Sequence, residues 1–170
     1  SSGSTDATGT SAKFKKPRGI TTDGTNLYVA DLHNHKIRKI VIATGVVTTF
    51  AGSGSQGSTD ATGTSATFTY PSGIATDGTN LYVSDYSNHK IRKIVIATGA
   101  VTTFAGSGSQ GSADGTGTAA RFKTPRGIVT DGTNLYVADS FNDKIRKIVI
   151  STGTVTTLAG SGSSGSGDGT

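Results

Sequence analysis

Short runs of alternating hydrophobic and polar residues, separated by turn residues, occur in the same order three times along this chain. In the middle copy, residues 73–77, 81–84, 90–96 and 101–105 predict four strands, which we call A to D. The two-residue period of a strand places Leu81 and Val83 on one face of strand B and Tyr82 and Ser84 on the other. No window carries the i, i+3, i+4, i+7 apolar stripe of an amphipathic helix. The pattern therefore predicts an all-β chain built from four-stranded antiparallel meanders.

The repeat has a period of 54 residues, because Pro17, Pro71 and Pro125 open equivalent segments and 71 − 17 = 125 − 71 = 54. Units 4–57 and 58–111 differ at only nine positions, and residues 112–165 form the third unit. Residues 166–170 begin a fourth linker. We interpret residues 1–170 as a single domain that is half of a larger ring.

Turn residues and linkers separate these strands. Gly, Asp and Asn are frequent in tight turns, so residues 77–80 predict the A–B turn and residues 85–88 the B–C turn. We expect the first aspartate of each B–C turn (Asp31, Asp85 and Asp139) to accept hydrogen bonds from backbone amides of that turn. The linker at residues 52–69 is rich in Gly, Ser and Thr. A linker of this length needs an anchor, so we expect Phe14, Phe68 and Phe122, each three residues before a proline, to pack between neighbouring units.

A four-stranded sheet of this size is too small to be stable alone, and such sheets stack radially in β-propellers of about 4–8 blades. The sequence DGTNLYV(A/S)DxxN(H/D)KIRKI, followed by VTT(F/L)AGSG, resembles the NHL repeat in all three units. This resemblance implies propeller blades, usually six in a ring, that serve as binding platforms for RNA or for proteins. It also implies that a minority of relatives are enzymes of the lyase type.

Three blades leave one outer face open at each end. We expect these faces to be lined by Leu27, Val29, Ile37 and Val41 or by their third-unit equivalents. A homodimer that closes a six-bladed β-propeller would cover both faces. Residues 1–8 align with residues 163–170, so in that ring the two segments would compete for one linker path and one copy is expected to be disordered.

The net charge of +5 is unevenly distributed. Nine of the 16 basic residues lie in the Lys-x-Arg-Lys of strand C, where we expect their stems to cover apolar surface and their charged ends to reach water. The other seven flank the prolines of units one and three, on the same side as the variable B–C turns. We call this side the loop face. Variation there is typical of a binding surface, and equally of neutral drift in exposed loops. The candidate residues for binding a partner or a polyanion are Lys13, Lys15, Lys16, Arg18, Tyr70, Tyr86, Arg121, Lys123, Arg126 and Phe141.

Catalytic, cofactor and metal sites are not expected. The chain has no cysteine, which excludes disulfides and thiolate chemistry, and no glutamate to pair with its aspartates. Each linker contains Gly-x-Gly-x-x-Gly, but no helix is predicted after it to hold a phosphate. His33 and His35 lie on the B–C turn of the first unit and His89 on that of the second, and equivalent positions in separate blades diverge around a ring, so we expect surface packing rather than a metal site. No apolar run approaches the roughly 20 residues that span a bilayer.

We therefore expect a non-catalytic β-propeller scaffold that assembles with itself and offers the loop face to a protein or RNA partner. Two alternatives remain open. The chain is a designed or excised repeat array without an evolved ligand, or it is a propeller that binds RNA or another polyanion.

Overall fold

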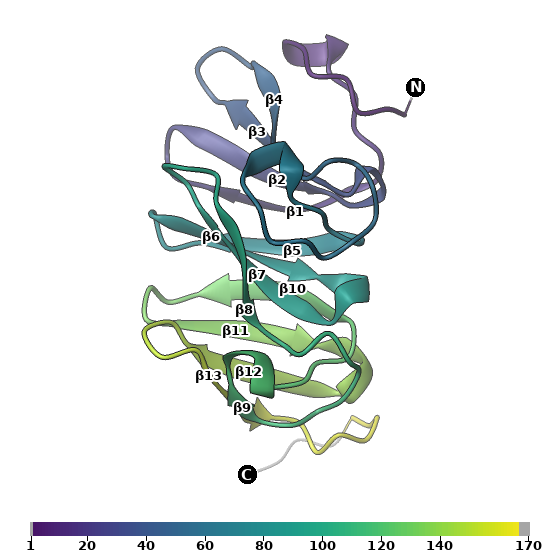
Figure 1. Cartoon of the computed structure of the whole chain (residues 1–170), viewed down its shortest axis with the longest axis vertical. Helices are drawn as coiled ribbons and strands as arrows, with labels where there is room; N and C mark the ends of the chain where they lie inside the picture. Colours follow the sequence, from purple (N-terminus) through teal and green to yellow (C-terminus); the bar gives the residue numbers. More distant parts are fainter. Residues whose placement is uncertain (1, 167–170) are drawn as a thin grey trace.

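The structure, a computed structural model, describes residues 2–166. Three antiparallel sheets stack along its long axis, with blade 1 at one end and blade 3 at the other (Figure 1). Within each blade the four main strands pair in the order of the sequence, which confirms the predicted meander. Blade 1 comprises β1 (Pro17–Thr22), β2 (Asn26–Asp31), β3 (Lys36–Val41) and β4 (Val47–Ala51). Blade 2 comprises β5 (Pro71–Thr76), β6 (Asn80–Asp85), β7 (Lys90–Val95) and β8 (Val101–Ala105). Blade 3 comprises β10 (Pro125–Thr130), β11 (Asn134–Asp139), β12 (Lys144–Val149) and β13 (Thr154–Ala159).

The B–C turns and linkers contain short 3-10 helices. The B–C turns form η2 (Leu32–Asn34), η4 (Tyr86–Asn88) and η6 (Ser140–Asn142). The linkers form η1 (Gly9–Ser11), η3 (Gly63–Ser65) and η5 (Gly117–Ala119). In the A–B turn of blade 2, Asp77 Oδ1 accepts from the N–H groups of Thr79 and Asn80 at 2.8 and 2.7 Å. Tyr82 donates to Asp77 Oδ2 at 2.9 Å, so one aspartate fixes both the turn and strand β6.

Each linker pairs with the outer edge of its blade, which the sequence pattern did not predict. In blade 3 the linker forms a short edge strand, β9 (Gly115–Thr116), which pairs antiparallel with β13. Thr62 and Thr8 make the equivalent bridges to Ala100 and Val46 in the other two blades. The N-terminal segment thus serves blade 1 as the inner linkers serve blades 2 and 3. The predicted competition between residues 1–8 and 163–170 involves residue 1 and residues 167–170, which lie outside the described residues.

The hydrophobic core lies between blades rather than within them. Phe68 is fully buried in a cluster that joins Tyr28 and Ile37 of blade 1 to Leu81 and Ile94 of blade 2. Phe122 is fully buried in the matching cluster between blades 2 and 3. The expectation that these phenylalanines pack between units is confirmed. Phe14 occupies the equivalent position ahead of blade 1 and is only half-buried.

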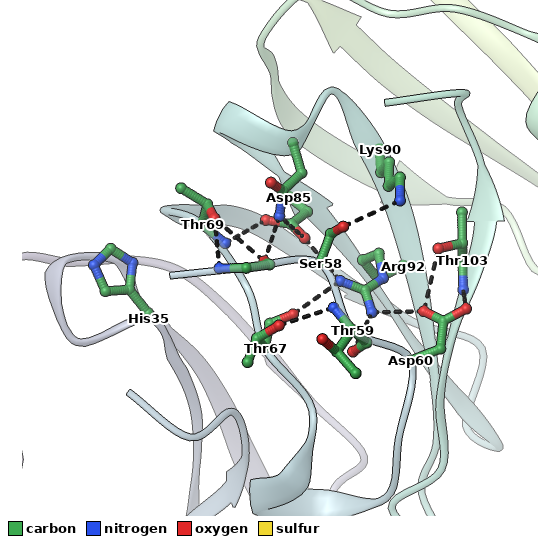
Figure 2. A network of polar contacts seen from close by, with 12 residues as sticks. His35, Ser58, Thr59, Asp60, Thr67, Thr69, Asp85, Lys90, Arg92 and Thr103 are labelled. Atoms are coloured by element: carbon green, nitrogen blue, oxygen red, sulfur yellow. Dashed lines mark hydrogen bonds and ion pairs between the residues drawn. The ribbon is translucent and has the colours of Figure 1, made fainter. Parts of the chain in front are cut away.

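A buried arginine fastens each linker to its blade (Figure 2). Arg92 is fully buried and donates to Asp85 at 2.9 Å and to Asp60 of the linker at 2.7 Å. It also donates to the carbonyl oxygens of Thr59 and Thr67, both at 3.0 Å. Arg38 and Arg146 make the same contacts in their own blades. The expectation that the charged ends of the whole Lys-x-Arg-Lys reach water is therefore wrong for the arginine, because two carboxylates and two carbonyls compensate its burial.

The expected role of Asp85 also needs correction. Its Oδ1 accepts from the N–H of Thr69, in the linker, at 2.8 Å rather than from an amide of its own turn. Its Oδ2 accepts from the side chains of Asn88 and Arg92 at 2.8 and 2.9 Å. Asp31 and Asp139 bond in the same way. The carboxylate thus ties the segment before the proline to the blade. The turn itself is closed by the hydrogen bonding of its own 3-10 helix.

The two outer faces differ from expectation in their residues. Ile37 is fully buried against blade 2, so its assignment to the outer face of blade 1 is wrong. Val41 lies on the same face of β3 as Ile37, because the two residues are four apart. The open face of blade 1 carries a hollow lined by Phe14, Ile20, Val29 and Ile40, among others. On the strands of blade 3 the exposed large apolar residues are Val129, Ile145 and Leu158.

Ser84 gives a stability prediction. It is fully buried between blades 2 and 3, and its Oγ has no hydrogen-bond partner within residues 2–166. The equivalent residues are Ala30 and Ala138. Ser84→Ala should raise the free energy of unfolding by about 1 kcal/mol, because a buried unpaired hydroxyl costs roughly that much or more. Urea unfolding measures the change, with Ser112→Ala at an exposed site as control. A loss of stability would show that the hydroxyl is paired.

Candidate loop-face binding site

The loop face is formed by the B–C turns and by the segments that lead into β1, β5 and β10. These three strands lie next to one another along the inner edge of the stack. A hollow of about 260 Å³ opens on this face. It is lined by Arg18, Leu32, His33, Tyr70, Tyr86, Ser87 and Arg126. Four of the ten residues predicted from sequence thus come together, and all three blades contribute.

Aromatic rings pack against Arg126, one of the two cationic side chains of this hollow. The Arg126 guanidinium lies 5.4 Å from the ring centroid of Tyr86 and 5.9 Å from that of Phe141, both within cation–π range. On the other side, the rings of His33 and Tyr70 meet edge to face at 5.4 Å. Phe141 thus belongs to the site through Arg126. His33, Leu32 and Ser87 were not singled out from the sequence as site residues.

The remaining predicted cations are spread over the face. Lys13, Lys15, Lys16 and Arg121 are exposed, and Lys123 is half-buried. Lys13 and Arg121 lie beside Gly3 and Gly111 of the linkers, whereas Lys15 and Lys16 lie close enough to His33 to affect its titration. Burial lowers the pKa of His33, and the charges of Lys16, Lys15 and Arg18 lower it further. The surrounding cations therefore favour the neutral form of His33.

His35 and His89 were expected to pack on the surface, but they lie inside the seams between blades. His35 Nδ1 accepts from the backbone N–H of Tyr70 at 3.1 Å, and His89 Nδ1 accepts from that of Thr124 at the same distance. Burial lowers the pKa of both histidines, which keeps Nδ1 free to accept. Their φ angles of 54° and 55° place them in the left-handed region at the end of the B–C turn. That conformation aims each imidazole at the next blade.

Neither a cluster of metal ligands nor a helix that could span a membrane is found in the described part of the chain. Within residues 2–166 no three His, Asp or other ligating side chains gather to hold a metal ion. No described helix is long and apolar enough to cross a membrane. The Gly-x-Gly-x-x-Gly of residues 52–57 leads only to the three-residue η3, not to a helix that could hold a phosphate.

Comparison with known proteins supports the repeat assignment. A sequence profile described as the NHL repeat matches residues 68–94. Protein SUPPRESSOR OF QUENCHING 1, chloroplastic, from Arabidopsis thaliana is 33% identical over 153 residues, which is 82% of this chain and 14% of that protein. NHL repeat-containing protein 2 from Homo sapiens is 40% identical over 101 residues, covering 56% of this chain and 14% of the relative. The chain thus spans 14% of the length of either curated relative.

A solved structure agrees with the fold. An auxiliary nutrient binding protein from Bacteroides thetaiotaomicron VPI-5482 superposes with a TM-score of 0.68 at 25% identity. The match covers 84% of this chain and 37% of that one. The arrangement of the three blades in the present chain therefore also occurs as part of that larger protein.

Proposed function

Because this chain belongs to the NHL-repeat β-propeller family, we propose that it is a non-catalytic scaffold that closes into a six-bladed ring with a second copy of itself. The loop face of that ring is the surface for a partner. The observation that carries this proposal is the match between the open face of blade 1 and the open face of blade 3.

Equivalent residues on the inner and outer faces differ sharply in exposure. Ile145 of blade 3 is 40% exposed, whereas its equivalents Ile37 and Ile91 are fully buried at inner junctions. Ile20 of blade 1 is 59% exposed, whereas Ile74 and Ile128 are 5% and 6% exposed. The two outer faces are therefore the two halves of an inner junction, and a head-to-tail contact between copies would bury both. Such a contact resembles a protein core cut in two, as in obligate interfaces.

The charged residues at the two ends support the same contact. At an inner seam, residue 35 accepts a hydrogen bond from the backbone of residue 70. Blade 3 lies two periods after blade 1, so its equivalent of residue 35 is residue 35 + 108 = 143. In a closed ring, blade 3 would be followed by blade 1 of the second copy, where the equivalent of residue 70 is residue 70 − 54 = 16. Asp143 would therefore face Lys16 of the second copy. A carboxylate would then accept the N–H and attract the ammonium of a lysine. The closing seam would pair opposite charges where the inner seams pair neutral groups, which favours copy-to-copy contact over other partners.

Ring closure restricts the number of copies. Three blades per chain allow rings of three, six or nine blades, and of these only six falls in the usual range of about 4–8. Two head-to-tail contacts close such a ring around a two-fold axis. Nearly identical units make the contact between copies follow the geometry of the contacts within the chain.

Gly127 offers a direct test of the ring. A Cβ built on Gly19 would lie 2.6 Å from the Ser72 carbonyl oxygen, and one on Gly73 would overlap the Arg126 carbonyl oxygen. The equivalent Gly127 has, within the described residues, only the Ala138 side chain near its Cβ position, at 3.8 Å. Gly127→Ala should therefore fold normally and fail to close the ring. Light scattering should give close to twice the 17.1 kDa chain mass for the unchanged protein and the single-chain mass for the variant.

Thr102→Ala, on the exposed outer strand of blade 2, is the matched control and should remain a dimer. Circular dichroism establishes that all three proteins are folded. A well-folded monomer of the unchanged protein at micromolar concentration would overturn the proposal, and so would a Gly127→Ala variant that still dimerises.

A further inference from the structure

The loop-face hollow owes its shape to one small residue. Position 18 of the first unit corresponds to Ser72 and Arg126 in the others, so a serine lies between two arginines around the inner edge. Ser72 is buried, and its Oγ donates towards the carbonyl oxygens of Pro125 and Arg126 at 3.3 and 3.2 Å. Arg18 and Arg126 therefore flank an open space over blade 2 rather than a third guanidinium.

The lining of this hollow combines positive charge with aromatic surface. The two guanidiniums carry full charges, and none of the described residues that line the hollow is acidic. Tyr70, Tyr86 and His33 supply rings, and Leu32 adds an apolar side chain. The aspartates of the neighbouring B–C turns are buried and already paired with other arginines, so they do not offset the positive charge of the hollow.

We propose that this hollow is a binding site for a small aromatic oxyanion, a single aromatic ring that carries a carboxylate or a phosphate group. An arginine fork matches the geometry of either group, and Tyr70 and Tyr86 line the hollow with aromatic surface against which an aromatic body can pack. At about 260 Å³ the hollow lies below the roughly 300–1,000 Å³ of sites for drug-sized ligands, which selects a one-ring molecule.

This inference rests on the loop face being the partner surface of the proposed scaffold, but it does not require a closed ring. Every lining residue comes from one chain. Ligand binding and chain mass are therefore measured separately. The Gly127→Ala variant should bind the ligand as the unchanged protein does, with one site per chain in both.

The test uses phenylacetate and phenyl phosphate as aromatic oxyanions. Cyclohexylacetate has the charge without the aromatic ring, benzyl alcohol has the ring without the charge, and sulfate is a bare anion. Calorimetric titration of the full chain should show binding of phenylacetate or phenyl phosphate with a clear preference over the other three probes. Comparison of the first two ligands distinguishes a carboxylate from a phosphate as the recognised group.

The repeats supply variants that the fold already accommodates. Arg18→Ser and Arg126→Ser install the residue that blade 2 has at this position, and each should weaken binding by about tenfold or more, as expected for loss of a charge-assisted hydrogen bond. Tyr70→Thr installs the residue of Thr124, which shares its left-handed backbone, and should remove the preference for the aromatic ring. Lys123→Thr removes the same charge from the loop face outside the hollow and should leave binding unchanged.

Several outcomes would overturn the inference. One is absence of binding by both aromatic oxyanions. Another is equal binding of sulfate, or an equal loss on Lys123→Thr, since either indicates a general basic surface. A third is equal binding of benzyl alcohol, which would make the hollow merely apolar. Preference for single-stranded RNA, with affinity that falls steeply in salt, would assign the face to a polyanion instead.

Discussion

Replacing Phe68 with alanine should lower the free energy of unfolding by about 3–5 kcal/mol, the range for a large buried aromatic residue. The ring is fully buried in the core between blades 1 and 2. The Arg92 guanidinium lies 5.1 Å from its centroid, so the substitution also removes a cation–π contact. Strands on both sides limit collapse of the cavity. Urea unfolding at one fixed protein concentration measures the change, because the proposed dimerisation would make stability depend on concentration.

Two further variants interpret that result. Phe68→Leu keeps most of the apolar volume and should cost markedly less than Phe68→Ala. Phe14→Ala removes the equivalent ring at the open face of blade 1, so it should weaken the dimer if the ring closes as proposed. A loss below about 1 kcal/mol for Phe68→Ala, typical of a surface site, would contradict the role of Phe68 as the anchor of the linker.

The local pattern of strand and turn residues predicts much of this fold, because the same pattern occurs in all three units. Alternation along strand B and the Asp-Gly-Thr-Asn turn together define the meander, since both act between residues close in sequence. Phe68 could also be placed correctly, because it is the large apolar residue in a long linker of Gly, Ser and Thr. The short edge strand, by contrast, has no alternation of its own. It forms because β13 offers an unpaired edge.

Residues whose partners are distant in sequence could not be placed in this way. Arg92 looks like a solvated charge, because charged residues are seldom fully buried unless paired. Its partner Asp60 is 32 residues away and in the linker. His35 likewise bonds to a backbone group 35 residues further on, in the next blade. The first contact depends on how the linker folds back on its own blade, and the second on how one blade sits against the next.

The loop face could be predicted, but the hollow on it could not. The composition of the turns and proline segments placed Arg18, Tyr70, Tyr86 and Arg126 on one side of the blades. Which of them meet depends on the rotation between blades, and this brings Arg18 and Arg126 around the small Ser72. The proposed closing seam was also hidden in the sequence, because the pairing of Asp143 with Lys16 that it would contain is suggested only by the observed contact between residues 35 and 70.

Asp85→Ala should destabilise the protein by about 3–5 kcal/mol, and Asp60→Ala by about 1 kcal/mol, although both carboxylates bind Arg92. Asp85 is fully buried, so its removal leaves the guanidinium and the Thr69 N–H buried without their acceptor. The side chain of Asp60 is 45% exposed, and water can replace it at the guanidinium.

Urea unfolding at low and high salt separates the two contributions. The effect of Asp60→Ala should shrink with added salt because an exposed ion pair is screened, whereas that of Asp85→Ala should stay nearly constant. Equal losses for the two variants, or a loss below about 1 kcal/mol for Asp85→Ala, would contradict the view that the buried pair holds the linker to the blade. A large loss of stability on Asp85→Ala that persists in high salt would mean that each blade depends on a buried charge pair. The sequence pattern presents the two members of this pair as separate surface residues.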